Sequence, residues 1–505
     1  MVDTSDCQTG PLAGALVGEE VIVVDGVLLM VASAAFVLTT AGVVVTLATD
    51  DRDPSVVLAW LFVIVIAPFL GLAAYFLVGR NLRAPRRWTT RRLERASALE
   101  EAHLAPAGGA ANAFAEAAVE QLQGSPAGRV ATIVMTEGGS EPLPADDVRL
   151  YFAGADKFHD LLADLAAATN HIHLMYLIWE QDELTAKVTE TLLERLDAGV
   201  RVHILYDWLS SLPYKKAELR RLAEKGAVVM PCYRRLPQLN YRNHMKIVII
   251  DGTVVYSGGM NLGQEYIDGG ARFDRWRDSH FRLTGPVAAP YLELFASTWM
   301  STGGPGHVLD GHPERPPARL TREATPVQVL HSSASTPTAA IRNLFIVALT
   351  AARRRVWIQS PYFVPDEPTL NALCVAASSG VDVRLMMTGL PDKRLPFYAA
   401  HAYFGQVLAS GVRVYQYTAG FMHAKSVLMD DDLVVLGTCN WDIRSLLLHD
   451  EVVAVIHGSQ QVAECAGHFE SDLECCHEVT LEQMDSLGSL RRARNSLCRL
   501  TSRLL

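Results

Sequence analysis

The sequence lacks the cysteine and histidine spacings that are typical of metal-binding and disulfide-rich proteins. Its eight cysteines include no C-x-x-C pair, and its 16 histidines include no H-x-x-x-H pair. Without such spacings a zinc site has no support, and we expect neither a metal nor a cofactor. Cys475 and Cys476 are adjacent and do not suit a routine bridge, so we expect reduced thiols in a cytosol-facing protein.

The chain also lacks an excess of positive charge and, over two long runs, any charge at all. Its formal net charge is -10 at pH 7, which argues against nucleic acid as a partner of a broad surface. Residues 27–48 and 56–78 form uncharged runs of 22 and 23 residues. At about 1.5 Å per residue, each run is long enough to cross a hydrocarbon core of ~30 Å.

These runs predict a two-helix transmembrane hairpin over residues 27–80, after an N-terminal tail of residues 1–26. The turn between the runs is acidic, whereas seven arginines lie between Arg80 and Arg95. Because basic flanks remain in the cytoplasm, we expect a multi-pass protein of the cell (inner) membrane with the rest of the chain, after residue 80, on the cytoplasmic side. A cleaved signal peptide would have a basic start, and the tail is acidic instead.

The rest of the chain contains two regions with the same order of elements. A basic segment and linker, residues 81–147, leads to a first half at 148–301, and a Pro- and Gly-rich linker, 302–326, leads to a second half at 327–480. In each half an apolar strand pattern, a helical pattern and a strand pattern that follows Gly-Val occur in turn. This alternation predicts an α/β fold made by duplication of one unit, with mixed or mostly parallel sheets.

The C-terminal tail, residues 481–505, has the pattern of a basic amphipathic helix. One stripe could contain its four leucines, Leu490, Leu497, Leu500 and Leu504, and arginines would lie around that stripe. Such a helix can rest on anionic lipid, and an ordinary helix packed on the preceding domain has the same pattern. The sequence leaves both interpretations open.

One motif occurs in each half. His244-Met245-Lys246 is followed by four apolar residues and Asp251, and His423-Ala424-Lys425 is followed by four residues and Asp430. After six further residues each copy has a glycine and then, three positions on, an asparagine: Gly258 and Asn261, Gly437 and Asn440. Two matching sets in one chain predict a single catalytic site built from two related halves.

The motif supplies what phosphodiester transfer through a covalent intermediate needs. Residues two apart on a strand project from one face, so each half offers an imidazole beside a positive charge. One imidazole attacks phosphorus, and the other donates a proton to the leaving alkoxide. The lysines, with Asn261 and Asn440, can hold the nonbridging oxygens. The predicted catalytic residues are His244, Lys246, Asp251, His423, Lys425 and Asp430, the aspartates as structural or orienting residues.

Alignment of the halves beyond the motif adds two acids. Asp278 lies seven residues before Gly285, and Glu451 lies seven before Gly458. A carboxylate bound to the second nitrogen of an imidazole fixes its tautomer and raises its basicity. We expect Asp278 and Glu451 to orient the two histidines.

Residues 148–480 resemble the phospholipase D superfamily in their paired H-x-K-x4-D motifs. Over nearly the whole chain the sequence is similar to bacterial cardiolipin synthases, in segments such as Asp51-Arg52-Asp53-Pro54-Ser55, Trp276-Arg277-Asp278, Gln359-Ser360-Pro361-Tyr362-Phe363 and Asn440-Trp441-Asp442-Ile443-Arg444-Ser445. The resemblance implies a duplicated phospholipase D-like α/β sandwich and a metal-independent reaction in which two phosphatidylglycerols give cardiolipin and glycerol. It implies that His244 carries the phosphatidyl group and His423 is the acid/base, and the near symmetry of the halves leaves the reverse open.

The sequence departs from the family pattern at a few positions. Family members often have serine where this chain has Gly259 and Thr438, and His449-Asp450 is not the commonest form before Glu451. A hydrolytic phospholipase D would share every catalytic residue. A nuclease is disfavoured by the membrane runs, and a noncatalytic scaffold by the two intact motifs. Acyl-chain preference and oligomeric state are left open.

Overall fold

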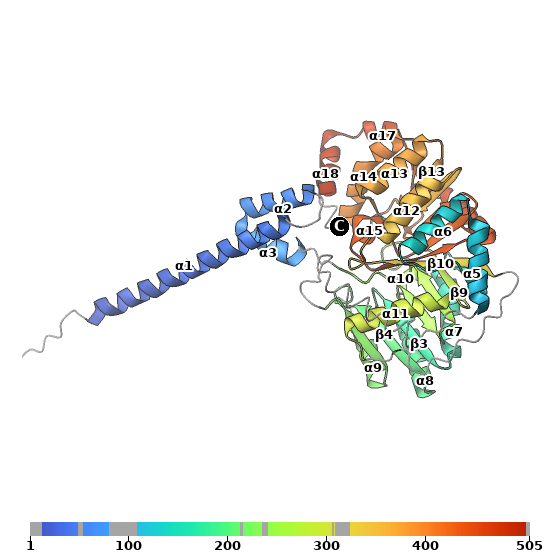
Figure 1. The fold of residues 1–505 in the computed structure, drawn as a ribbon, viewed down its shortest axis with the longest axis horizontal. Helices are drawn as coiled ribbons and strands as arrows, with labels where there is room; N and C mark the ends of the chain where they lie inside the picture. Colours follow the sequence, from blue (N-terminus) through green and yellow to red (C-terminus); the bar gives the residue numbers. More distant parts are fainter. Residues whose placement is uncertain are drawn as a thin grey trace, which may run out of the picture. The chain divides into compact units, whose positions relative to one another are not determined.

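The chain divides into two compact units, Met1–Ala84 and Pro85–Leu505. The computed structural model describes residues 13–48, 54–79, 109–212, 216–234, 241–305, 308 and 324–500. The predicted basic segment after Arg80, most of the linker between the halves and the last five residues lie outside these ranges. Figure 1 shows the described elements along the chain.

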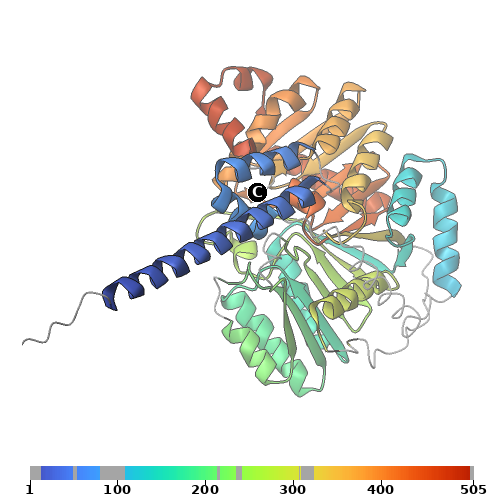
Figure 2. The same cartoon turned by 60° about the vertical axis from the view of Figure 1, so that its left-hand side comes forward.

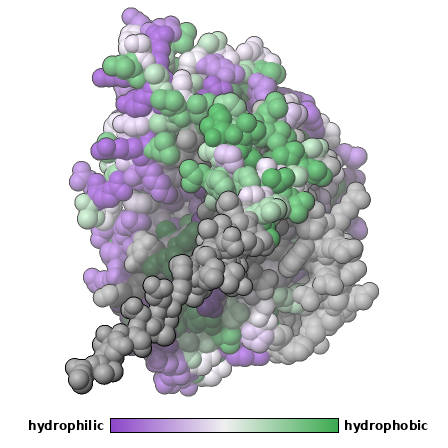
Figure 3. Space-filling model, turned by 90° about the vertical axis from the view of Figure 1, so that its left-hand side faces the viewer, coloured by the Kyte–Doolittle hydropathy of each residue, from purple (hydrophilic) through white to green (hydrophobic). Residues whose placement is uncertain are grey.

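The N-terminal unit begins with one long helix, α1 (Ala13–Ala48). Its part Met30–Ala48 is the one described helix that is long and apolar enough to cross a membrane. Met30 and Leu38 are 71% and 73% exposed, as expected for side chains that face lipid. Figure 3 shows one face of the molecule, on which hydrophobic side chains gather over a broad area.

The second uncharged run is not the continuous helix that its length predicts. It forms α2 (Pro54–Ile66), α3 (Pro68–Ala74) and a π-helical turn, η1 (Tyr75–Gly79), with a break at Ala67. Pro68 has no backbone N–H with which to continue the hydrogen bonds of α2, and it therefore begins a new helix. The expected second membrane helix is therefore not confirmed, and the run forms shorter helices.

The segment after the break runs back along α2. A Cβ atom added to Gly71 would lie 2.9 Å from the backbone of Ile64, so glycine permits the close approach of the two helices. Further along, the rings of Trp60 and Tyr75 lie 5.5 Å apart. Both pairs are symmetric about the break, which makes α2 antiparallel to α3 and η1.

The second unit contains two sheets of like topology. The first has the order β2 (Asp147–Tyr151), β9 (His280–Thr284), β7 (Val254–Gly258), β6 (Ile247–Ile250), β3 (His171–Tyr176), β4 (Arg201–Asp207), β5 (Val228–Cys232). Strands β3, β4 and β5 are parallel, and the others pair antiparallel. The sheet is therefore mixed, which is one of the two alternatives, mixed or mostly parallel, that the sequence predicted.

The second sheet repeats this order and adds a strand at each edge. Its strands are β1 (Leu143–Ala145), β10 (Thr325–Ser332), β19 (Glu451–Ile456), β17 (Leu433–Gly437), β16 (Ser426–Met429), β11 (Arg355–Gln359), β13 (Asp382–Thr388), β14 (Arg413–Tyr417) and β20 (Cys476–Val479). Strands β16 and β11 occupy the places that β6 and β3 hold in the first sheet. The duplication read from the sequence is thus present in the strand order.

Helices cover both faces of each sheet. The outer layers are α7 (Gly154–Ala167), α8 (Glu183–Asp197) and α9 (Ala217–Glu224) on the first sheet, and α12 (Ala340–Ala351), α13 (Glu367–Ser378) and α14 (Arg394–Ala409) on the second. Between the sheets lie α11 (Ala288–Thr302) and α16 (Ser459–Leu473), whose side chains join the inner faces of both sheets in one core. Figures 1 and 2 show the two halves side by side.

The described part of the predicted linker before the first half, residues 109–147, is folded. It contains α5 (Gly109–Leu122), α6 (Pro126–Thr136) and β1. Val130 and Val134 of α6 join the core of the second half, and β1 pairs with β10. The residues before the first half therefore complete the second half, which sequence order did not indicate.

The C-terminal tail packs on the second half through its basic side chains. It forms α17 (Leu481–Asp485) and α18 (Ser489–Leu500). The guanidinium of Arg494 lies 3.6 Å from the ring centroid of Tyr398 on α14, and that of Arg499 lies 4.6 Å from Tyr403. The leucines of the predicted stripe face away and are 64–85% exposed: Leu490, Leu497 and Leu500.

Candidate active site

The two motifs lie at equivalent ends of equivalent strands. His244 and Lys246 immediately precede β6, and His423 and Lys425 immediately precede β16. All four side chains are buried or nearly so, with the two histidines 8% and 9% exposed. The histidine and lysine of each motif therefore lie in the interior of the second unit.

Backbone pairing between the halves brings the two motifs together. Strand β8 (Trp276–Arg277) of the first half pairs with β15 (Phe421–Met422) of the second, and the His423 N–H donates to the Arg277 carbonyl at 2.7 Å. At the corresponding place, the His244 N–H donates to the carbonyl of Asp450 at 3.0 Å. Each histidine is thus anchored beside the acid segment of the other half.

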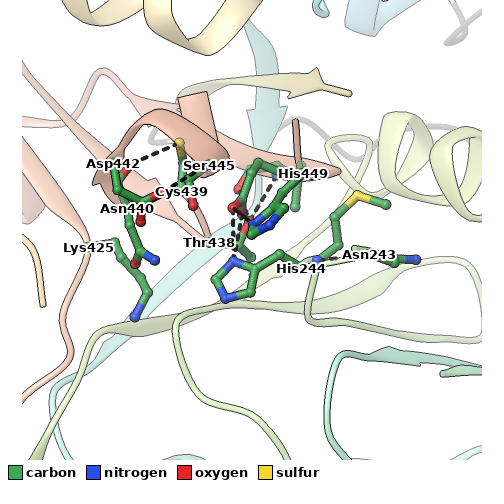
Figure 4. A network of polar contacts seen from close by, with 12 residues as sticks. Asn243, His244, Lys425, Thr438, Cys439, Asn440, Asp442, Ser445 and His449 are labelled. Carbon is green, nitrogen blue, oxygen red and sulfur yellow. Dashed lines mark hydrogen bonds and ion pairs between the residues drawn. The ribbon is translucent and has the colours of Figure 1, made fainter. Parts of the chain in front are cut away.

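The carboxylates that contact the two imidazoles are exchanged between the halves. Nδ1 of His244 lies 2.9 Å from the Glu451 carboxylate, and Nδ1 of His423 lies 2.7 Å from Oδ2 of Asp278. A carboxylate at Nδ1 leaves Nε2 as the reactive nitrogen. Figure 4 shows His244 of the first half among Lys425, Asn440 and Thr438 of the second. The geometry is that of one site with two oriented imidazoles.

Each lysine is held close to its own histidine. The ammonium of Lys246 donates to the His244 carbonyl at 2.6 Å, and that of Lys425 donates to the His423 carbonyl and lies 2.9 Å from its Nδ1. Burial lowers the pKa of Lys246 to about 7 and that of Lys425 to about 8, against the attraction of nearby carboxylates. A bound phosphodiester would favour their charged forms.

Burial also keeps the imidazoles neutral. Burial and then the charge of Lys246 hold the pKa of His244 well below its usual range. Burial and then Lys425 lower the pKa of His423 to about 4. Burial opposes ionisation of Asp278, but Lys425 and His423 hold its pKa below the usual range. An ionised Asp278 accepts the Nδ1–H of a neutral His423, and this leaves a lone pair on Nε2.

The asparagines of the motifs are buried near these groups. The amide nitrogen of Asn261 donates to the Tyr266 hydroxyl at 2.7 Å, and the ring of Tyr266 lies 6.1 Å from that of His423. The Oδ1 atoms of Asn261 and Asn440 are buried without a hydrogen-bond partner in the described part of the chain. The Asn261 amide has a second N–H, which can donate to a phosphate oxygen while the first holds Tyr266.

Asp251 and Asp430, predicted with the motif as structural or orienting residues, lie away from the imidazoles and bind backbone N–H groups. Asp251 follows β6 at the end opposite His244, and its carboxylate accepts the backbone N–H groups of Thr169, Asn170 and His171 at 2.7–2.9 Å. Asp430 accepts those of three successive arginines before and at the start of β11: Arg353, Arg354 and Arg355. Each aspartate therefore fixes the loop that enters the neighbouring strand.

The departures from the family pattern have structural consequences at the carboxylates. The hydroxyl of Thr438 donates to Glu451 at 2.5 Å. At the equivalent position of the first half, a Cβ atom on Gly259 would lie 2.0 Å from Oδ1 of Asp278, so only glycine fits there. Both positions follow the glycine of their motif, which marks them in the sequence, but these contacts could not be predicted from it.

The fold and the site define a phospholipase D-like phosphatidyltransferase with two H-x-K halves. A family model described as "Cardiolipin synthase, PLD-like domain" matches residues 161–294 and 345–473, and one described as "Phospholipase_D-nuclease N-terminal" matches 35–80. The chain belongs to the cardiolipin synthase family.

Similar proteins of known name agree with this membership. A cardiolipin synthase of Halalkalibacterium halodurans is 33% identical, and the match covers 92% of this chain and 91% of that protein. One of Geobacillus thermodenitrificans is 34% identical, and the match covers 90% of each. The crystal structure of phosphatidylserine synthase from Haemophilus influenzae Rd KW20 has a TM-score of 0.57 at 14% identity, covering 74% of this chain and 98% of that one. That likeness supports the fold alone.

Proposed function

We propose that this enzyme transfers a phosphatidyl group from one phosphatidylglycerol to another, giving cardiolipin and glycerol through a phospho-histidine intermediate. The observation that carries the proposal is the exchange of carboxylates, Glu451 on His244 and Asp278 on His423. Because each imidazole is oriented by the opposite half, both act on one phosphorus rather than at separate sites.

In the first step Nε2 of His244 attacks the phosphorus of a phosphatidylglycerol. The negative charge of the bound phosphodiester raises the pKa of the otherwise neutral His423, which takes up a proton at Nε2. The bond to the glycerol oxygen breaks, and His423 gives this proton to the leaving alkoxide. In the second step neutral His423 takes the proton of a hydroxyl on a second phosphatidylglycerol. That oxygen attacks phosphorus, the phosphorus–nitrogen bond breaks, and His244 is regenerated. The proton and the phosphatidyl group both balance over the cycle.

The lysines stabilise the charge that develops on the nonbridging oxygens. Lys246 and Lys425 are buried, and charge stabilisation is stronger in a site from which water is excluded. Asn440 and Asn261 supply neutral donors once their amides turn to the phosphate. These residues supply the binding and charge that the proposed scheme requires.

The enzyme acts at the cell membrane with its second unit on the cytoplasmic side. The anionic lipid substrate and the apolar α1 helix support a membrane location, and the arginines after Arg80 support the orientation. The predicted multi-pass path requires α2, α3 and η1 to follow one another end to end across the bilayer. The antiparallel packing of α3 on α2 instead favours a pair that enters and leaves the bilayer on one face.

Product analysis tests the proposed reaction. Detergent-solubilised full-length protein given phosphatidylglycerol should release glycerol and form cardiolipin without added divalent metal. His244→Ala and His423→Ala should each lower turnover by ~10³-fold or more, whereas His477→Ala, an exposed histidine of β20, should leave it unchanged. Phosphatidate as the main product would support the hydrolytic alternative. A strict requirement for CDP-diacylglycerol would overturn the proposal.

A further inference from the structure

A third histidine lies beside the His244–Glu451 pair and takes no part in the proposed transfer. Nδ1 of His449 lies 3.8 Å from Oε1 of Glu451, and its ring centroid lies 5.8 Å from that of His244. Both ring nitrogens of His449 are buried, and neither makes a hydrogen bond to any part of the chain that the structure describes. A buried imidazole without a hydrogen-bond partner is unusual and requires an explanation.

The three side chains have the composition and spacing of a cation site. One ligand atom each from His244, His449 and Glu451 lies within 4.8 Å of the others. In a tetrahedral zinc site, bonds of about 2.0–2.2 Å place ligand atoms roughly 3.3 Å apart. The distances from Glu451 to His244 and to His449, 2.9 and 3.8 Å, bracket that value. Two imidazoles and one carboxylate, with a fourth position for water, are a common ligand set for Zn²⁺.

The residues around these three side chains hold Glu451 in place but also weaken cation binding by their positive charge. The carboxylate of Glu451 is fully buried, and Thr438 holds its Oε2 through a hydrogen bond, so Oε1 remains directed at the histidines. Figure 4 shows His244, Thr438 and His449 gathered in one place. Lys246 and Arg444 place positive charge nearby, which weakens the binding of any cation.

We infer that His244, His449 and Glu451 form an inhibitory site for Zn²⁺ or a similar divalent transition metal. The metal takes the place of the proton between Nδ1 of His244 and Glu451, that proton moves to Nε2 of His244, and His449 completes the site. The neutral imidazole, bound to metal through Nδ1, then carries its one N–H proton on Nε2. That nitrogen then has no lone pair for attack on phosphorus, so the bound metal blocks the first step of the transfer.

The inference makes His449 the residue that distinguishes metal sensitivity from activity. His244 and Glu451 are needed for the proposed reaction, whereas neither ring nitrogen of His449 makes a hydrogen bond to a motif lysine or to Asp278 in the described part of the chain. The variant His449→Gln retains a similar volume and hydrogen-bonding capacity but offers weaker ligation. His477→Gln, the same substitution at an exposed position of β20, is the matched control.

Metal binding and inhibition are measured on the full-length protein in detergent. Zn²⁺ alone is titrated, bound metal is counted after removal of excess, and glycerol release is followed with and without a chelator. The wild type and His477→Gln should bind one more equivalent than His449→Gln and lose activity reversibly. His449→Gln should need about tenfold more Zn²⁺ for the same inhibition. Comparison of variants is necessary because Cys475 and Cys476 can also bind zinc.

Equal zinc sensitivity or equal bound metal in wild type and His449→Gln would overturn the inference. The activity measurement rests on the proposed function, but the count of bound metal does not, so the two failures can be told apart. If His449→Gln does not fold, the Co²⁺ absorption spectrum of the wild type decides. Tetrahedral nitrogen and oxygen ligation would support the site, and purely thiolate ligation would refute it.

Discussion

At the scale of single residues, one aspartate of the first half orients an imidazole and another fixes a loop. Asp278 contacts Nδ1 of His423 at 2.7 Å, whereas Asp251, which belongs to the conspicuous motif, binds backbone N–H groups before β3. The motif therefore marks two kinds of residue that sequence alone does not separate. Its histidine and lysine lie at the proposed phosphate site, and its aspartate stabilises the strand connection behind them.

The same substitution at the two aspartates should separate these roles. Asp278→Asn removes the negative charge at Nδ1 of His423 and no longer fixes its tautomer, so kcat should fall by ~10²–10⁴-fold with little change in KM. Asp251→Asn should leave kcat of the folded enzyme near that of the wild type. It should lower the free energy of unfolding by about 1–3 kcal/mol, because charge-assisted hydrogen bonds to three amides are weakened. Steady-state kinetics and denaturant unfolding check both expectations; a large fall in kcat for Asp251→Asn contradicts the structural role.

At the scale of elements, periodicity and length predicted the repeated strands and helices of the two halves but not every connection between them. Patterns of two related halves indicated β3, β4, β11 and β13 with their helices, because each is a local property of the sequence. The exchange of Glu451 and Asp278 between halves depends on β8 pairing with β15, a contact between segments far apart in the chain. Likewise, hydrophobicity alone could not show that Pro68 and Gly71 turn the second run back on α2.

The path of that second run predicts where the N-terminus lies. Helix α2 has 13 residues, about 20 Å at 1.5 Å per residue, which is too short to cross a core of ~30 Å. Phe36 of α1 lies beside Phe69 at the turn between α2 and α3, with ring centroids 4.5 Å apart, and the apolar part of α1 continues beyond that level to Met30. The α2–α3 turn therefore lies within the apolar length of α1.

We expect the N-terminus on the face opposite the second unit. A cysteine placed at Thr4 in a cysteine-free background should react with a membrane-impermeant maleimide in intact cells, and one placed at His477 should react only after lysis. Labelling of the first cysteine only after lysis would instead support the predicted path with two full crossings.

At the scale of the whole molecule, the two halves of one chain supply the parts of the site that two identical subunits would otherwise have to supply. Both sheets have the same strand order, and the inner faces share one core with α11 and α16. Each half supplies one histidine and the carboxylate for the other histidine. A complete site therefore forms within one polypeptide, and neither half has an oriented imidazole of its own.

A mixture of two inactive variants tests this arrangement. His244→Ala and His423→Ala chains, coexpressed or mixed in equal amounts, should show no more activity than the sum of the separate proteins, because every chain lacks one of its two imidazoles. If the first half of one chain instead met the second half of another, half of the chain pairs would be mixed. One of the two sites in each mixed pair would have both histidines, which would restore about one quarter of wild-type turnover. Glycerol release by the coexpressed variants, compared with a coexpressed wild type at the same total protein, distinguishes the two results. Recovery near that fraction would show that the site is shared between chains.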